Sequence, residues 1–135
     1  MILSYSQVMT HNIETNKLNA INFYRMAFEG KPRKSVERYV GDEYIQHNPS
    51  VRDGKEGFID YFEQMHREYK SKRIEFLRAI SEGDLVALHT RQIWPNNEEY
   101  VTMDFFRFDE NGKIIEHWDS IQKVPRESMN ANTVF

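Results

Sequence analysis

The sequence predicts an α+β fold, in which helices come first and an antiparallel sheet follows them. Two observations carry this prediction. Before Lys72 the apolar residues recur at spacings of three and four, the period of an amphipathic helix, whereas after Lys72 they alternate with polar residues as in a strand. Turn sequences divide the second half into four segments. The helices are therefore expected to cover one face of a twisted sheet.

Three helices are expected in the first half of the chain. The first begins near Thr15 and ends before Gly30, with apolar residues three and four positions apart. The second is short and begins at Pro32, whose fixed φ suits a first helical position. The third follows Asp53, which together with Glu56 has the pattern of a capping box.

Four strands are expected after the helices, at residues 73–81, 85–94, 100–108 and 113–122. The segments between them are rich in Gly, Pro, Asn and Asp, which form tight turns. The segment from Tyr44 to Pro49 is expected to be an extended or turn link between the second and third helices, because proline disfavours helical geometry in the residue before it.

The chain has 135 residues, a formal net charge of −3 and no cysteine. This length is typical of a single domain, which we expect over residues 1–135, with a possible N-terminal arm at 1–13 and a C-terminal tail at 124–135. Charges of both signs are mixed, so no basic stripe suits nucleic acid or an anionic membrane. Without cysteine or a signal-peptide pattern, the sequence predicts a cytoplasmic protein whose partner is a small molecule.

The short loops between the strands allow facing residues to be predicted, taking Trp94 opposite Glu99 and Phe108 opposite Lys113. That register places two rows of polar residues on the helix-covered face, namely His89, Asp104 and His117, and then Arg91, Thr102 and Asp119. Apolar residues frame both rows. A few ionisable groups within an apolar frame are typical of a small-molecule pocket, in which Asp119 is the leading chemical candidate.

Each of these polar residues also has a purely structural interpretation. The two histidines can be ordinary sheet residues, and Arg91 and Asp119 can form an ion pair. Asp104 can serve to fix the register through a contact with either histidine. Perturbed or paired ionisable groups mark function only in a fraction of cases, so both interpretations stay open at this point.

The opposite face of the predicted sheet is strongly apolar, with Val86, Leu88, Val101, Met103, Phe105, Ile114 and Trp118. So large an apolar face is rarely left in water. We therefore expect it to pack against a second copy of the chain in a homodimer. The alternative is that the arm or the tail covers it.

A set of short motifs runs along the chain: Tyr44 to Pro49, Asp53-Gly54, Gly57-Phe58, Glu82-Gly83-Asp84 with Val86 and His89, Asp104 to Arg107, Gly112 to Ile114, and Glu116 to Asp119. Together they resemble the SnoaL-like polyketide cyclases of the nuclear transport factor 2 superfamily, over roughly residues 15–125. This resemblance implies a cone-shaped, curved antiparallel sheet that wraps around a pocket closed by the three helices. It also implies a dimer through the outer sheet face.

The resemblance implies roles for particular residues as well. In the cyclases of this family an aspartate near the end of the last strand acts as acid and base in an intramolecular aldol closure, and Asp119 matches it. The expected site has Asp119 and His117 as catalytic residues and, as substrate-binding residues, His47, Asn48, His89, Arg91, Asp104, Tyr44 and Phe62. The epoxide hydrolases of the superfamily need an Arg-x-Asp pair on an inner strand, which residues 85–89 lack.

The predicted chemistry is proton transfer at a carbon next to a carbonyl, in an aldol cyclisation or an isomerisation, with Asp119 as base and a histidine donating to the oxyanion. Burial would raise the pKa of this carboxyl, whereas an ion pair with Arg91 would lower it. A non-catalytic binder of a small hydrophobic metabolite and a structural dimerisation module are the alternatives. No cofactor or metal is expected, because the histidines lack a recognised ligand spacing, although His47, His89 and His117 can in principle converge on zinc.

Overall fold

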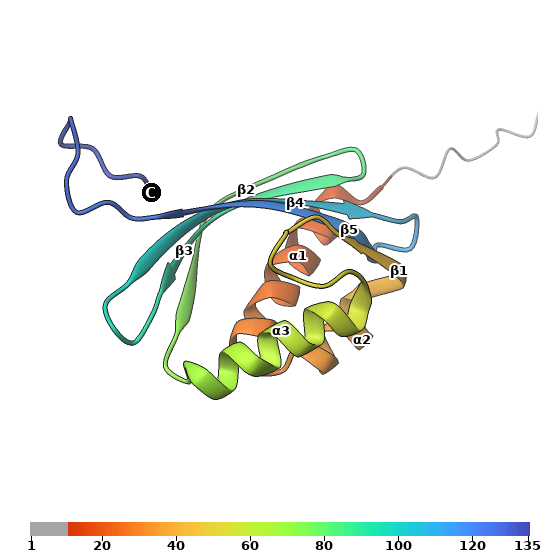
Figure 1. The fold of residues 1–135 in the computed structure, drawn as a ribbon. Coiled ribbons are helices and arrows are strands. Elements are labelled where there is room, and N and C mark those ends of the chain that lie inside the picture. Colours follow the sequence, from red (N-terminus) through yellow and green to blue (C-terminus); the bar gives the residue numbers. More distant parts are fainter. Residues whose placement is uncertain (1–10) are drawn as a thin grey trace, which may run out of the picture.

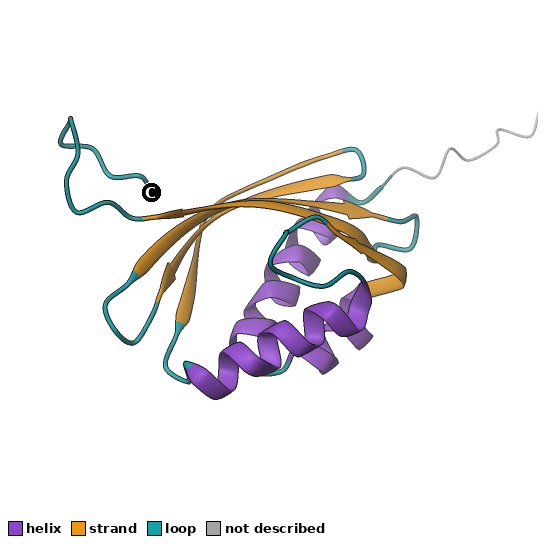
Figure 2. Ribbon diagram, viewed as in Figure 1, coloured by secondary structure: helices purple, strands orange, loops and turns teal. Residues whose placement is uncertain are grey.

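The computed structural model describes residues 11–135. It contains the helices α1 (Ile13–Phe28), α2 (Pro32–Tyr39) and α3 (Gly54–Glu68) and the strands β1 (Val40–Gln46), β2 (Arg73–Glu82), β3 (Leu85–Ile93), β4 (Glu99–Phe108) and β5 (Ile114–Lys123). All three helices lie on one side of a curved sheet (Figures 1 and 2). The α+β class and the three expected helices are confirmed. The predicted arm lies almost entirely outside the described residues.

The sheet has five strands in the order β1-β5-β4-β3-β2 and does not close into a barrel. The prediction of four strands was therefore wrong by one. The extra strand, β1, pairs in parallel with β5, so the sheet is mixed instead of purely antiparallel. A parallel partner so distant along the chain leaves no hairpin pattern in the local sequence, which is why this segment had been interpreted as a link.

Side chains at the helix ends explain where α1 and α3 begin. The Asn12 carboxamide accepts a hydrogen bond from the Thr15 amide and caps α1. Asp53 caps α3, accepting from the amides of Gly54 and Gln46, and so ties the end of β1 to this helix. The predicted capping box is wrong in its second half, because the Glu56 carboxylate pairs with Arg33.

The core lies between the helices and the concave face of the sheet. Phe23 of α1 stacks on Phe58 of α3 at 4.7 Å between ring centroids and meets Phe106 of β4 edge-on at 6.0 Å. All three rings are fully buried. Within residues 11–135 no helix is long and apolar enough to cross a membrane.

The register between β3 and β4 differs by one residue from the prediction. Ile93, and not Trp94, lies opposite Glu99, because Trp94 belongs to the loop, where its amide donates to the Glu98 carbonyl at 2.9 Å. A slip of one residue turns every side chain of a strand to the other face. Consequently Val86 and Leu88 point into the core, whereas His89 and Arg91 lie on the outer face.

The register between β4 and β5 differs by two residues, which preserves the faces. Asp104 lies opposite Asp119 and Phe106 opposite His117. A bulge next to Phe108 shifts the pairing and places Ile114, expected on the outer face, in the core. Asp104 and His117 therefore share the helix-covered face, as predicted, but they are diagonal neighbours and do not face each other directly.

Gly57 holds the loop between β1 and α3 against the helix. A Cβ atom at this position would lie 1.9 Å from the Arg52 carbonyl oxygen, far inside contact distance. We expect Gly57→Ala to destabilise the fold by about 1–3 kcal/mol, because backbone must move to relieve the clash. Urea unfolding measures this, with Gln64→Ala on the exposed side of the same helix as the control. Equal stability of the two variants would contradict the close approach.

Candidate functional site

Asp119 lies on the concave side of β5 and is only partly exposed. Its Oδ2 atom accepts a hydrogen bond from the Asn48 side-chain amide at 2.9 Å. Burial raises the pKa of the Asp119 carboxyl above its ordinary value, and the charge of Asp104 across the strand pair raises it further. The Asn48 amide and His117 act in the opposite direction. The result is a carboxylate that binds a proton more readily than one in water.

Asn48 is itself fixed by the loop that follows β1. Its backbone amide donates to the side-chain oxygen of Gln46 at 3.0 Å, and its own side-chain oxygen accepts from the Ser50 amide at 2.8 Å. The side-chain NH₂ group is thereby aimed at Asp119. An asparagine used in this way orients the carboxylate without neutralising it, since the donor is uncharged.

A buried hydrogen-bond network lies directly behind Asp119. The His117 Nε2 atom lies 2.8 Å from Asp104 Oδ1, and both side chains are almost completely buried. Asp104 also accepts from the Tyr24 hydroxyl at 2.5 Å and from the Thr102 hydroxyl. Three donors around one carboxylate compensate for its removal from water.

The second ring nitrogen of His117 is occupied as well. Its Nδ1 atom lies 3.2 Å from the Tyr44 hydroxyl, which in turn accepts from the Gln46 side-chain amide. Burial, followed by the charge of Asp104, raises the pKa values of Tyr24 and Tyr44 well above their ordinary value. Both hydroxyls therefore stay protonated at neutral pH. With both nitrogens engaged, His117 has no free nitrogen for a ligand.

Asp119 faces a small cavity that adjoins a larger groove. The cavity has a volume of about 30 Å³ and is lined by Tyr24, Phe28, Gln46, Asn48, Val51, Phe58, Tyr61, Phe62, Met65, Gln92, His117, Asp119 and Ile121. The groove has about 320 Å³ and is lined by Tyr61, Tyr69, Gln92, Trp94, Asn96, Glu98, Tyr100 and Ile121. Three residues line both spaces, so the groove leads towards the carboxylate.

Three of the expected site residues lie elsewhere. His47 is exposed, stacks on Trp118 at 4.8 Å and has its Nε2 atom 2.9 Å from a Glu116 oxygen. His89 lies on the outer face with its Nδ1 atom 3.0 Å from Arg78. The slip in the β3–β4 register accounts for His89 and for Arg91. His47 faces outwards because β1 pairs with β5, which the sequence pattern did not reveal.

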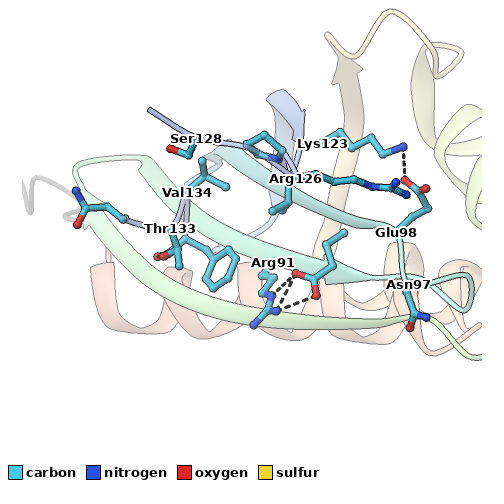
Figure 3. A pocket seen from close by; sticks show the side chains of 13 residues that line it. Arg91, Asn97, Glu98, Lys123, Arg126, Ser128, Thr133 and Val134 are labelled. Carbon is cyan, nitrogen blue, oxygen red and sulfur yellow. Dashed lines mark hydrogen bonds and ion pairs between the residues drawn. The ribbon is translucent and has the colours of Figure 1, made fainter. Parts of the chain in front are cut away.

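Arg91 lines a cavity of about 470 Å³ between the outer face of the sheet and the tail after β5 (Figure 3). Its guanidinium group makes a two-pronged ion pair with Glu99 at 2.9 Å and lies 4.0 Å from the Phe135 ring centroid. Arg91 therefore does not form the ion pair with Asp119 that the sequence left open, and its carboxylate partners are Glu99 and, at 3.6 Å, Glu75. Because Arg91 and Lys123 are both paired with carboxylates there, the chemistry favours the smaller cavity at Asp119.

Sequence reasoning missed Tyr24, Tyr61 and Gln92 at the site. Gln92 has the same parity as Val86 and Leu88 and would have been found with the correct β3 register. Tyr61 follows the helical spacing of the residues that face the sheet, and Tyr24 shares the three-and-four spacing of the first predicted helix. Their hydroxyl groups were the available signal, since buried tyrosines usually have a hydrogen-bond partner.

The histidines do not converge on a common metal position, because His47 and His89 lie on the outer side of the sheet. Another donor set does come together: Asp104, His117 and Asp119 have ligand atoms within 4.8 Å of one another. A cation there would have to break the hydrogen bond between His117 and Asp104. This hydrogen bond brings His117 and Asp104 together, and the pairing of β4 with β5 places Asp119 opposite Asp104.

Comparison with known proteins shows that the fold is shared with solved structures. Among solved structures, TsrD from Streptomyces laurentii has a TM-score of 0.69 at 15% identity, covering 82% of this chain and 90% of that one. An isomerase candidate of the SnoaL-like family from Agrobacterium tumefaciens has a TM-score of 0.68 at 16% identity. The match covers 80% of this chain and 98% of that one. IdmH, a polyketide cyclase candidate from Streptomyces antibioticus, has a TM-score of 0.65 at 16% identity. The match covers 82% of this chain and 92% of that one.

These likenesses establish the fold, whereas the family follows from the sequence. A search among curated proteins finds no significant match. The model of the SnoaL-like domain, in contrast, matches residues 20–117, most of the chain and nearly all of the helix and sheet layers. The chain belongs to the SnoaL-like family.

Proposed function

We propose that this protein is an acid–base enzyme that moves a proton at a carbon next to a carbonyl group, with Asp119 as the base. The observation that carries this proposal is the placement of the Asp119 carboxylate. It is half-buried at a cavity wall, oriented by the neutral Asn48 amide, and has a raised pKa because of burial. General-base efficiency is greatest when the pKa of the base approaches the working pH.

The residues around Asp119 suggest how each step proceeds. The ionised carboxylate removes a proton from the carbon, the C–H electron pair moves into the C–C bond of the enolate, and the carbonyl electrons move to the oxygen. The Gln92 amide and the Tyr61 hydroxyl line the same cavity and are the donors we assign to this oxyanion, since both nitrogens of His117 are engaged. In an isomerisation Asp119, now a carboxylic acid, returns the proton to a different carbon of the enolate system. In an aldol closure the enolate carbon instead attacks a second carbonyl group of the same molecule, the electrons of that C=O bond move to its oxygen, and Asp119 gives its proton to the resulting alkoxide.

A non-catalytic binder of a small hydrophobic metabolite is the second candidate. It is favoured by the adjoining groove, which at about 320 Å³ has the size of a small-molecule site and is not lined by Asp119. A binder does not require a carboxylate with a raised pKa, however, and an ionisable group in that position costs stability. The two candidates therefore differ in whether Asp119 is needed.

Deuterium exchange separates these candidates. Small methyl ketones are incubated with the protein in D₂O, and loss of the α-hydrogen signal is followed by NMR. We expect the wild type to catalyse this exchange and Asp119→Asn to have lost it. Glu116→Gln, which changes a carboxylate on the outer side of the same strand, should retain it. Ligand binding without exchange would favour the binder.

We also propose that a second copy covers the outer face around Phe105. Met103 and Phe105 are about half exposed, at 50% and 48%, although the tail covers the neighbouring Arg91. The wild type is expected to be a two-fold dimer by light scattering, and Phe105→Glu a monomer or an aggregate. Leu18→Glu changes an exposed apolar residue on α1 and is the control. A monomeric wild type would contradict this proposal.

A further inference from the structure

The groove beside the Asp119 cavity is rich in aromatic side chains. Trp94 lies at its centre and meets Tyr69 edge-on at 4.9 Å and Tyr100 at 5.9 Å between ring centroids. All three rings line the groove, which at about 320 Å³ has the size of a small-molecule site. Faces and edges of aromatic rings suit a flat ligand, because ring pairs prefer offset or edge-to-face contacts.

The charges around the groove indicate what such a ligand carries. Among the described residues that line it there is no lysine, arginine or histidine. Its one ionisable carboxylate, Glu98, already pairs with Lys123, and Asp119 lies in the adjoining cavity. The other polar groups of the lining are uncharged, namely the Gln92 and Asn96 amides, the tyrosine hydroxyls and the Trp94 indole N–H. An anion would be desolvated there without a partner and would face the Asp119 charge.

Tyr61 lies at the junction of the groove and the cavity. It lines both spaces, together with Gln92 of β3 and Ile121 of β5. These two belong to the sheet, whereas Tyr61 is supplied by α3 on the opposite side. Among the three shared residues, Tyr61 is therefore the one that lines the junction from the helix side.

We propose that the aromatic groove is a ligand subsite for an uncharged planar group and that Tyr61 determines which ligands reach from it to Asp119. This inference deepens the proposed function and rests on it only in treating the bound molecule as a substrate. The groove positions the flat part of the molecule, and the Tyr61 ring limits the bulk of the part that enters the cavity.

Trp94 provides a reporter for the subsite. The chain has two tryptophans, and Trp118 lies on the other side of the sheet, stacked on His47. In a Trp118→Phe background the emission of Trp94 is titrated with para-acetylbenzamide and para-acetylbenzoate, which differ little in shape but differ in charge. We expect the uncharged amide to bind at least tenfold more tightly. A smaller preference, or no response of Trp94 to the amide, would overturn the inference.

The role of Tyr61 is tested in the same background with two probes of different bulk. Tyr61→Ala is expected to improve the affinity of an acetylbiphenyl carboxamide relative to para-acetylbenzamide by at least tenfold, because the groove and the cavity become one space. The matched control is Tyr69→Ala, which lines the groove alone and should weaken both probes alike. An unchanged ratio in Tyr61→Ala would overturn this role.

Failure of this inference can be told apart from failure of the proposed function. If the amide binds and wild-type protein exchanges no α-hydrogen, the subsite stands and the proposed catalysis is rejected. If exchange depends on Asp119 but the probes show no charge preference, the catalysis stands and the subsite is rejected.

Discussion

Asp104→Ala is expected to lower the stability of the fold more than any other single change considered for this site. Asp104 accepts hydrogen bonds from Tyr24, Thr102 and His117 in a region closed to water. Removing it takes the carboxylate acceptor away from three buried donors. A buried donor left without an acceptor costs about 1–3 kcal/mol, so the loss over this network is a large part of the roughly 5–15 kcal/mol typical of a domain.

Urea unfolding of Asp104→Ala and wild type measures this loss. The control is Asp84→Ala, which removes a carboxylate from a half-exposed ion pair with Arg107 and should cost about 1 kcal/mol or less. Tyr24→Phe in the Asp104→Ala background should recover part of the loss, because it removes one of the stranded donors. A loss no greater than that of the control would mean that the network contributes little.

Asp119→Asn is expected to abolish catalysis while keeping the fold. Loss of a positioned general base typically costs a factor of about 10²–10⁴ in rate. The carboxamide oxygen introduced by this substitution can still accept the hydrogen bond from the Asn48 amide, so the loop stays in place. Burial of an ionised carboxylate disfavours the folded state, and its removal should leave the melting temperature unchanged or raise it.

The pH dependence of this difference has a defined sign. The pKa of Asp119 is raised in the folded protein, so the folded state binds a proton more tightly than the unfolded chain does. Its ionisation therefore costs stability only above the ordinary aspartate pKa of about 4, and the full cost is present above the raised folded value. The stability of Asp119→Asn should therefore exceed that of the wild type by most near neutral pH, and the two should be equally stable near pH ~3.

Thermal unfolding of wild type and Asp119→Asn across this pH range tests whether the fold is kept. The deuterium-exchange assay tests whether catalysis is lost. The Glu116→Gln variant makes the same change in charge on the outer side of β5. A large loss of stability in Asp119→Asn at neutral pH, with exchange intact, would assign this residue a structural role.

The sequence predicted the helices and the position of the strands well because local periodicity reports which residues face a core. It predicted Asp104 and His117 on one face because the expected β4–β5 register differs from the real one by two residues, which preserves parity. The prediction failed for His89 and Arg91 because Trp94 belongs to the loop. This shifts the register by one residue and turns every side chain of β3 to the other face of the sheet. Loop length at that precision is not encoded in hydrophobic alternation.

The contribution of β1 was missed for a different reason. This strand delivers Tyr44 and Gln46 to the network and leads into Asn48, yet its pairing with β5 is parallel and distant in sequence. The family resemblance supplied Asn48 and Tyr44 where periodicity could not. It also suggested His47, whose side chain turns to the outer face because neighbouring residues of an extended segment alternate.

The proposed mechanism requires Asp119 to be a base held in a partly buried position and not an ordinary surface carboxylate. Its titration can be followed directly by carboxyl ¹³C NMR, with the spectrum of Asp119→Asn identifying the resonance. We expect a midpoint above the ordinary aspartate value of about 4. A midpoint at or below that value would contradict the mechanism, because such a carboxylate would be too weak a base for the proposed proton transfer.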